Sequence, residues 1–136
     1  MKTDHKYLIK MSKILKNILL FFVAIFLLST IGVYGLIYAF VYSIFNIKKS
    51  SFGEYWGNLL YQINVGIDMI GNVMLGKFLN HHAIQDKTIY PFGNVNYTIS
   101  HVLAVNKLKH DNTTRFGDWI IDILERIDPG HMEISL

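Results

Sequence analysis

The residues best suited to chemistry lie in the last third of the sequence, where hydroxyl, imidazole and carboxylate side chains occur close together. Ser100 is followed directly by His101, and Asp128, His131 and Glu133 form a second group nearer the C-terminus. A carboxylate that orients an imidazole is an arrangement used for general base catalysis. One hypothesis is therefore an anchored hydrolase or nuclease that uses His101, Asp128 and His131.

The sequence around these residues favours a structural role over a catalytic one. Glycines do not bracket Ser100 as they would in a nucleophile elbow, and no glycine-rich phosphate loop occurs in the chain. Asp128 and His131 flank a Pro-Gly pair, and polar side chains in that position commonly stabilise a turn. We therefore predict that the protein is not an enzyme and has no catalytic residues.

Metal and cofactor binding are also disfavoured by the spacing of possible ligands. The chain has six histidines and no cysteine. The histidines form neither an HxxxH nor an HExxH pair, and the adjacent pair His81-His82 is a weak metal signal. We predict no metal site and no cofactor. The lack of cysteine excludes disulfides and leaves the redox compartment undetermined.

Several polar residues of the C-terminal half carry a resemblance. They are Asn72 and Gly76 in IGNVMLGK, Thr98-Ile99-Ser100 in NYTIS, and Asp128-Pro129-Gly130-His131 with Ser135 in DPGHMEIS. With these elements the chain resembles an uncharacterised family of short proteins associated with bacteriophages and prophages. The resemblance implies a phage or prophage origin and names no activity.

The chain departs from that family pattern in three places. Met132 stands where the family usually has cysteine, and His101-Val102 replaces a small residue followed by arginine. The spacing between Gly76 and Thr98 is also longer. The first departure argues against any reactive or metal-binding role that the family cysteine would have.

A long apolar segment decides the class of protein. From Asn17 to Ile47 the chain has about 31 residues without a charge, whereas about 20 are enough to cross a bilayer. Its hydroxyl residues Ser29, Thr30 and Ser43 can bond to preceding backbone carbonyls. We predict one long, tilted transmembrane helix. A cleaved signal peptide is the alternative, but its apolar region would be about 7–15 residues long.

The apolar segment also carries candidate contacts for a second helix. Small residues allow close approach of helices in lipid, and tyrosines repeated every four residues share one face. The helix-contact candidates are Ser29, Gly32, Gly35, Tyr34, Tyr38 and Tyr42. The alternative is that the glycines occur at the ordinary frequency for membrane helices.

The distribution of charge predicts the orientation. Up to Lys49 the chain has seven lysines and one acidic residue, whereas the rest has nine acidic and six basic residues. Five of the lysines precede the apolar segment, so the basic segment 1–16 is predicted to be cytoplasmic and the C-terminal region to lie on the opposite side of an inner or plasma membrane. Because the basic residues flank an apolar run, we predict no nucleic-acid partner.

The segment 48–80 is predicted to be membrane-associated. From Glu54 to Leu79 apolar residues recur at helical spacing, which indicates an amphipathic helix. Its few charges and four glycines favour a helix that lies on the membrane or packs against a partner helix. A second membrane crossing is the alternative, with Asp68 as an acid within the membrane. Otherwise Asp68 is predicted to be a surface carboxylate.

The remaining segment 81–136 is predicted to be a small helical region. Residues 81–97 have the composition of a loop, and Thr98 is a plausible N-cap for a helix that ends near Lys109. A second helix is predicted from Arg115 to Ile127, ended by Asp128-Pro129-Gly130. The fold class is therefore all-α, with one long transmembrane helix followed by amphipathic and short helices.

These features lead to three functional hypotheses. The first is a noncatalytic small membrane protein, of viral or mobile-element origin, that self-assembles and affects membrane permeability. The second is an accessory subunit of a larger membrane complex, and the third is the anchored hydrolase. The expected partners are the lipid bilayer and either further copies of the chain or another membrane protein.

Overall fold

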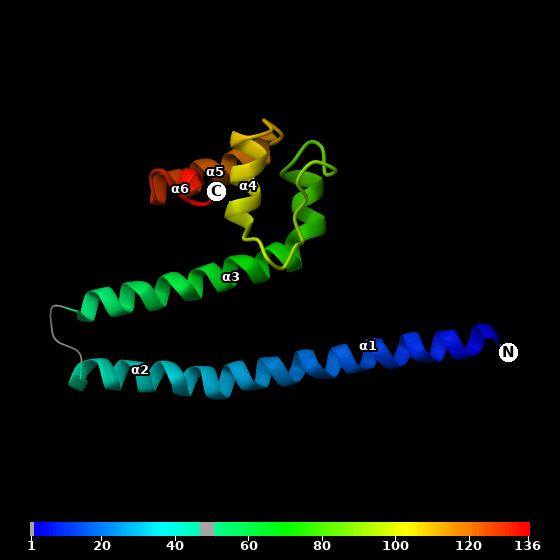
Figure 1. The fold of residues 1–136 in the computed structure, drawn as a ribbon, viewed down its shortest axis with the longest axis horizontal. Helices are drawn as coiled ribbons and strands as arrows, with labels where there is room; N and C mark the ends of the chain where they lie inside the picture. Colours follow the sequence, from blue (N-terminus) through cyan, green and yellow to red (C-terminus); the bar gives the residue numbers. More distant parts are fainter. Residues whose placement is uncertain (1, 47–50) are drawn as a thin grey trace. The chain divides into compact units, whose positions relative to one another are not determined.

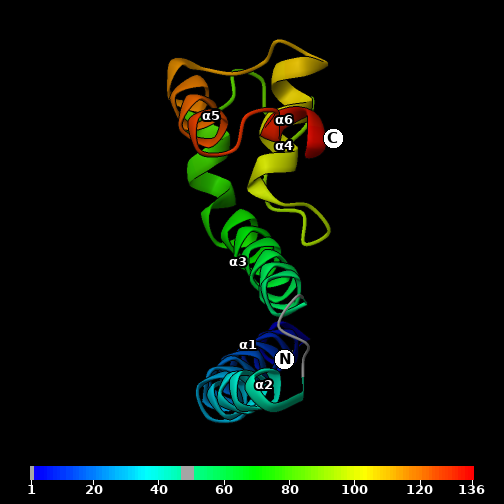
Figure 2. The same ribbon diagram turned by 90° about the vertical axis from the view of Figure 1, so that its left-hand side faces the viewer.

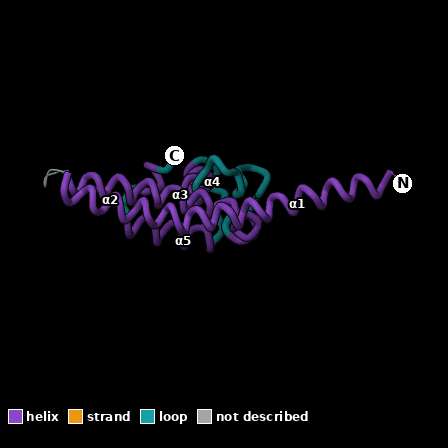
Figure 3. The backbone as a smooth tube through the Cα atoms, turned by 90° about the horizontal axis from the view of Figure 1, so that it is seen from below, coloured by secondary structure: helices purple, strands orange, loops and turns teal. Residues whose placement is uncertain are grey.

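The described part of the chain is built from helices and loops. The computed structural model describes residues 2–46 and 51–136, and no strand occurs within them (Figure 3). One isolated bridge joins Ile84 to Thr113. The all-helical expectation is confirmed for these residues. The chain divides into two units, Met1–Glu54 and Tyr55–Leu136, which are described separately.

The N-terminal unit is one helical rod. It consists of α1 (Lys2–Leu27), the π-helical segment η1 (Leu28–Gly32) and α2 (Val33–Asn46), which follow one another without a break (Figure 1). The predicted helix from Asn17 is confirmed, but it begins earlier, because the basic segment has neither glycine nor proline to stop it. Ile47, the predicted end, lies outside the described residues.

The π-helical turn coincides with two hydroxyl side chains. Ser29 Oγ and Thr30 Oγ1 both donate hydrogen bonds to the carbonyl oxygen of Phe26, at 3.0 and 2.7 Å. Further along, Ser43 Oγ donates to the carbonyl of Phe40 at 2.8 Å. The predicted bonding of these hydroxyls to preceding carbonyls is confirmed, and the carbonyl that accepts two hydroxyls precedes the π-helical turn.

The apolar part of this rod is a candidate membrane span. From Met11 to Asn46 it has 36 residues, and the mean hydropathy of its most apolar window is 2.4. Large apolar side chains are exposed along it, such as Leu19, Phe22 and Ile31. Length and composition are thus compatible with a membrane location.

The second unit is organised on α3 (Phe52–His82). The amphipathic helix predicted for residues 54–79 is confirmed in position and is slightly longer at both ends. His81 and His82 belong to its last turn, so the predicted loop begins two residues too early. In Figure 1 the last turns of α3 change direction relative to its first part. The predicted segment also included residues 48–50, which lie outside the described residues.

The two faces of α3 have different surroundings. Ile67, Ile70, Met74 and Phe78 leave half or more of their surface exposed. On another side of the helix, Asn72, Gly76 and Leu79 are buried and Asp68 is partly buried. The prediction that Asp68 is a surface carboxylate is therefore wrong, because its carboxylate faces the N-terminus of the next helix.

Asparagine side chains hold the loop from residue 83 to residue 98. Asn72 is fully buried, donates to the carbonyls of Asn94 and Tyr97 at 2.9 and 2.8 Å, and accepts from the Gly93 amide at 2.9 Å. Asn80 pairs with both the amide and the carbonyl of Phe92. These side chains replace the backbone partners that a strand or helix would supply, so the loop can be packed without unpaired polar groups.

A second asparagine pair fastens the same loop to the helices that follow. Asn106 Nδ2 donates to the carbonyl of Tyr90 at 2.8 Å, and its Oδ1 accepts from Asn112 Nδ2 at 2.7 Å. Asn112 also pairs with the backbone amide and carbonyl of Asp86. Both asparagines are buried, and their amide groups are satisfied by these bonds.

Two short helices complete the predicted part of the unit. They are α4 (Ile99–Leu108) and α5 (Arg115–Ile127), close to the predicted bounds. The predicted N-cap is confirmed, because Thr98 Oγ1 accepts from the His101 amide at 2.9 Å. The buried apolar cluster lies between these helices, the end of α3 and the loop, and comprises Leu79, Ala83, Ile84, Phe92, Val102, Leu103, Ala104, Ile121 and Met132.

Two glycines permit close backbone contacts in this unit. A Cβ atom on Gly117 would overlap the carbonyl oxygen of Ala83, and one on Gly76 would lie 2.9 Å from Gly93 Cα. The first contact packs the start of α5 against the end of α3. The second packs α3 against the loop.

A further short helix, α6 (His131–Ile134), was not predicted. Gly130 precedes it with a φ of 86°, a conformation that favours glycine. Glu125 accepts from the amides of Gly130 and Met132, both at 2.8 Å. Figure 2 shows α6 in front of α4, with α5 to one side. The turn Asp128-Pro129-Gly130 thus ends α5 as predicted but also begins another helix.

Candidate functional site: a cavity in the C-terminal unit

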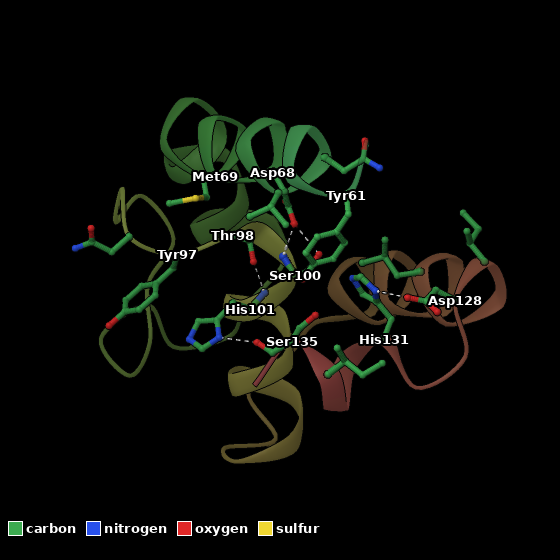
Figure 4. A pocket seen from close by; sticks show the side chains of 16 residues that line it. Tyr61, Asp68, Met69, Tyr97, Thr98, Ser100, His101, Asp128, His131 and Ser135 are labelled. Atoms are coloured by element: carbon green, nitrogen blue, oxygen red, sulfur yellow. Dashed lines mark hydrogen bonds and ion pairs between the residues drawn. The ribbon is translucent and has the colours of Figure 1, made fainter. Parts of the chain in front are cut away.

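A cavity of about 730 Å³ opens between α3, the start of α4, the end of α5 and α6 (Figure 4). This volume lies in the range of sites that bind small molecules. Apolar side chains supply much of its wall, and they are Val65, Met69, Leu124, Ile127 and Ile134. All sixteen lining residues belong to the C-terminal unit.

The cavity brings together most of the polar residues singled out in the C-terminal sequence. The lining includes Thr98, Ser100, His101, Asp128 and His131. Asn72 is not among the lining residues, because it is buried against the loop. The sequence separates the first three from the last two by almost thirty residues, and the packing of α5 and α6 on α4 joins them.

Asp68 was not predicted to belong to this group, yet it is the carboxylate that holds α4 in place. Its Oδ1 accepts from the Ile99 amide at 3.0 Å, and its Oδ2 accepts from the Ser100 amide at 3.3 Å and from Ser100 Oγ at 2.7 Å. A carboxylate at a helix N-terminus satisfies amides that have no partner within the helix. In the sequence, the sign of this contact is an acidic residue on the helix that precedes the Thr-x-Ser cap. Such a residue does not by itself show that its carboxylate bonds to the cap.

His101 is fixed by hydrogen bonds at both ring nitrogens. Nδ1 donates a hydrogen bond to the carbonyl oxygen of Ser135 at 2.7 Å, and Nε2 lies within hydrogen-bonding distance, 3.0 Å, of the Tyr90 hydroxyl. Burial raises the pKa of Tyr90 to about 12, with a further contribution from Tyr97. Tyr90 therefore keeps its hydroxyl proton, and the Tyr90 hydroxyl and the Ser135 carbonyl together fix the orientation of the His101 ring.

His131 has a different environment. Its Nδ1 lies 3.0 Å from Asp128 Oδ2, so the carboxylate orients the ring and accepts the Nδ1 proton. Nε2 is buried and forms no hydrogen bond with any described residue. In Figure 4 the ring edge away from Asp128 is turned toward the middle of the cavity. In the neutral ring, Nε2 is thus an unpaired acceptor.

The helix that carries His131 is held by Glu125. The amides of Met132 and Gly130 donate to its carboxylate and hold the pKa of Glu125 below its ordinary value. Both hydrogen bonds are stronger when the carboxylate of Glu125 is charged. Glu125 therefore positions α6, and through α6 it places His131 beside Asp128.

The Asp128–His131 pair resembles a carboxylate-oriented base. The hydroxyl of Ser100 donates to Asp68, and that of Tyr90 lies 3.0 Å from His101 Nε2. Neither hydroxyl is bonded to His131, as an activated nucleophile would be. Among the residues that the structure describes, no group of three or more His, Asp or Glu side chains is arranged to hold a metal ion.

The predicted helix-contact residues lie in the other unit. Tyr34, Tyr38 and Tyr42 are 71%, 61% and 46% exposed, and the rings of the last two stack with centroids 6.1 Å apart. A Cβ on Gly35 would meet no atom within 4 Å, whereas one on Gly32 would lie 3.2 Å from a Leu28 methyl group. The tyrosines and Gly35 therefore present an uncovered surface, while Gly32 and Ser29 make contacts within their own helix.

Comparisons with protein-family models, with curated proteins and with solved structures found no match to this chain. The resemblance to short phage-associated proteins therefore stays a prediction. In residues 2–46 and 51–136 the structure shows helices and loops, one candidate membrane span, and a C-terminal unit whose cavity has polar and apolar walls.

Proposed function

We propose that this chain is a noncatalytic accessory protein of a larger membrane assembly. The helix from Met11 to Asn46 anchors it in the bilayer, and the C-terminal unit docks on a membrane-protein partner. The proposal rests on the two faces of α3. One face packs against the rest of the C-terminal unit, whereas the apolar face is exposed.

The anchor follows from the side chains exposed along the N-terminal rod. Phe26 and Leu28, in the middle of the apolar stretch, are 64% and 71% exposed. Transfer of one such side chain out of water stabilises by about 1.5–3 kcal/mol, and many of them line this helix on all sides. Hydrocarbon satisfies that requirement for the roughly 20 residues or more that a tilted helix places inside a bilayer, because the backbone groups are already paired within the helix.

The docking face is the apolar surface formed by α3 and α5, here called the α3–α5 surface. Its members are Ile67, Ile70, Met74, Phe78 and Trp119. Phe116 links the two helices, because its ring meets Phe78 edge-on at 5.9 Å and stacks on Trp119 at 5.7 Å. A contiguous apolar surface of this kind marks an interaction site.

Two polar residues in the second half of α3 are not available to line an aqueous pore. Asp68 accepts three hydrogen bonds from the start of α4, and Asn72 makes three with the loop. Facing these groups toward a channel would break the contacts that hold the unit together. The accessory function is therefore favoured over a pore built from α3.

The proposal includes the orientation and origin expected from the sequence. The lysines before the apolar helix support a cytoplasmic N-terminus, and in this orientation the C-terminal unit meets its partner on the opposite side. The phage-like elements Asn72, Thr98-Ile99-Ser100 and His131 belong to the folded unit, which is consistent with a mobile-element origin for that unit.

A second candidate is the self-assembled protein that affects membrane permeability. The uncovered surface of Tyr34, Gly35, Tyr38 and Tyr42 favours it, because small and amphipathic residues of this kind support contacts between helices in lipid. In this candidate the pore would be formed by the N-terminal rods and not by α3.

Reconstitution distinguishes the two candidates. The full chain is inserted into vesicles that contain a self-quenching dye, with empty vesicles as the control. The accessory function predicts no dye release above the control at any protein-to-lipid ratio. Release that increases with the amount of protein would contradict it and support the permeabiliser.

Site-specific crosslinking in the native membrane tests the docking face. A photoreactive side chain at Met74, which is 73% exposed, is expected to form one discrete adduct with another membrane protein. The same group at the exposed residue Asp122 is the matched control and is expected to form none. Adducts at Met74 with lipid alone, or with a second copy of the chain, would contradict docking on a partner.

A further inference from the structure

We propose that the first turns of α3 lie in the headgroup layer of the membrane, on a stripe formed by Trp56, Leu60 and Ile63, here called the α3 stripe. These residues share one face of the helix, which continues into Ile67 of the α3–α5 surface. The inference rests on the bilayer anchor of the proposed function and adds a second contact with lipid. It also locates the proposed partner, which meets the chain at the membrane surface.

A short connection ties the start of α3 to the end of the apolar helix. Asn46 is the last residue of the candidate span, and Phe52 is the first residue of α3. The chain from Asn46 to Phe52 reaches at most about 20 Å when fully extended. A span that ends at Asn46 therefore keeps the start of α3 within reach of the headgroup layer.

The side chains of this part of α3 suit the boundary between lipid and water. From Tyr55 to Ile67 the chain has no Asp, Glu, Lys or Arg, whereas a helix that faces water normally carries charges on its outer face. The rings of Tyr55, Trp56 and Tyr61 combine an apolar body with a polar group, and such side chains are enriched at membrane interfaces. The composition therefore favours lipid headgroups as the surroundings of these turns.

The opposite sides of the helix allow this contact without disturbing the folded unit. Leu60 and Ile67 are 52% and 62% exposed and lie on one face. Val65 and Met69, which line the cavity, lie on the opposite face by helical spacing. Lipid on the Leu60 side thus leaves the cavity and the helices α4, α5 and α6 on the side of the water.

The stability of these turns also favours a contact with lipid. Among the described residues, none from Tyr55 to Ile67 belongs to the buried apolar cluster of the C-terminal unit. Gly57 and Gly66 lower the stability of the helix, and a few turns without tertiary packing are marginally stable in water. Burial of the α3 stripe among headgroups and upper acyl chains stabilises them.

The second half of α3 disfavours a complete crossing of the membrane. Asp68 accepts hydrogen bonds from the start of α4, and Lys77 is exposed. A crossing helix would carry these ionisable groups and the attached α4 into hydrocarbon, which is costly. We therefore expect α3 to lie along the membrane surface.

Spin labelling of the full chain in lipid vesicles tests the proposal. The chain has no cysteine, so single nitroxide labels can be attached at Leu60→Cys and at Gln62→Cys, on opposite sides of the helix. The ratio of collisions with oxygen to collisions with a water-soluble nickel complex is expected to be severalfold higher at residue 60 than at residue 62. Equal nickel access at both residues would indicate water, and exclusion of both reagents from residue 60 would indicate a protein contact. Either result would overturn the proposal.

A label at Ala24→Cys in the same vesicles separates this proposal from the proposed function. If residue 24 is shielded from nickel while residue 60 is not, the headgroup contact is overturned and the anchor stands. If nickel reaches both residues, the anchor is overturned, and the headgroup contact with it.

The fluorescence of Trp56 supplies a measurement that leaves the α3 stripe unchanged. Trp119→Phe makes Trp56 the single tryptophan of the chain. Its loss of emission is expected to be greater with lipids brominated near the headgroup than with lipids brominated near the end of the acyl chain. The opposite order would indicate a helix that crosses the membrane, and no loss would indicate a helix in water. Both of these results contradict the headgroup contact.

Discussion

Ser100 Oγ donates a 2.7 Å hydrogen bond to Asp68 Oδ2 and so joins α4 to α3 across 32 residues of sequence. The same carboxylate accepts hydrogen bonds from the backbone amides of Ile99 and Ser100. Asp68 and Ser100 could be mistaken for a catalytic acid and a nucleophile. They are instead parts of one helix cap. This contact fixes the direction of α4 and the position of the cavity lining that follows it.

Substitution of Asp68 by asparagine is expected to destabilise the C-terminal unit by about 1–3 kcal/mol, because an amide keeps only one accepting oxygen and has no charge. Denaturant unfolding of the full chain in nanodiscs, followed by near-ultraviolet circular dichroism, measures the change. Asp122→Asn is the control, since Asp122 is exposed. Equal stability of the two variants would show that the cap contributes nothing.

Asn72→Leu is expected to release the loop from α3. The substitution leaves the Gly93 amide and the carbonyls of Asn94 and Tyr97 without their partner, at a cost of at least about 2 kcal/mol. Hydrogen exchange at the Gly93 amide is expected to accelerate strongly. Asn58→Leu, on the exposed side of α3, serves as the matched change and is expected to leave that amide protected.

Gly117→Ala is expected to destabilise the unit by about 3 kcal/mol, because the added methyl group would overlap the backbone of Ala83. This value is at the upper end of the usual range for substitutions that overpack a core. A backbone atom cannot move aside as a flexible side chain would. Gly53→Ala is the control, since a Cβ there meets no atom within 4 Å. Thermal unfolding of both variants compares them, and a similar effect of the two would contradict the close contact.

The stability of α6 is expected to depend on pH through Glu125. Its pKa is lowered from 4.5 by the amides of Met132 and Gly130, so the folded unit favours the charged form. The contribution is fully present above pH 4.5 and is lost as the pH falls through the lower pKa of the folded state. The protection factor of the Met132 amide, which corrects for the slower intrinsic exchange in acid, is expected to fall on acidification.

Glu125→Gln supplies the control for that pH dependence. The variant is expected to show a low protection factor at the Met132 amide at neutral pH and little further change in that factor on acidification. Glu133→Gln, which alters an exposed carboxylate that accepts no hydrogen bond from the described residues, is expected to behave as the unmodified chain does. Retention of a steep acid response in Glu125→Gln would show that another group controls α6.

Local signals in the sequence predict much of this fold. The apolar stripe from Phe116 to Ile127 specifies α5, and Thr98 specifies the start of α4, because capping and periodicity depend on residues a few positions apart. The uncharged stretch after Asn17 likewise specifies a long helix. Its earlier start at Lys2 follows from the absence of any helix breaker in the basic segment.

Long-range pairings account for what the sequence does not predict. Asp68 has its partners 31 and 32 residues away, and Asn72 has partners 21 to 25 residues away. A polar residue on an amphipathic helix is expected to face water unless such partners are known. The short helix α6 was missed because four residues show no periodicity, and its support comes from Glu125 in the preceding helix.

A depth measurement tests most directly the proposed insertion of the helix from Met11 to Asn46 in a bilayer. The chain has no cysteine, so a single nitroxide label can be attached at Ala24→Cys, in the middle of the apolar stretch, or at Asp122→Cys as the exposed control. In reconstituted vesicles the label at residue 24 is expected to be relaxed by oxygen and shielded from a water-soluble nickel complex, with the opposite result at residue 122. Accessibility of residue 24 to the nickel complex would contradict the account.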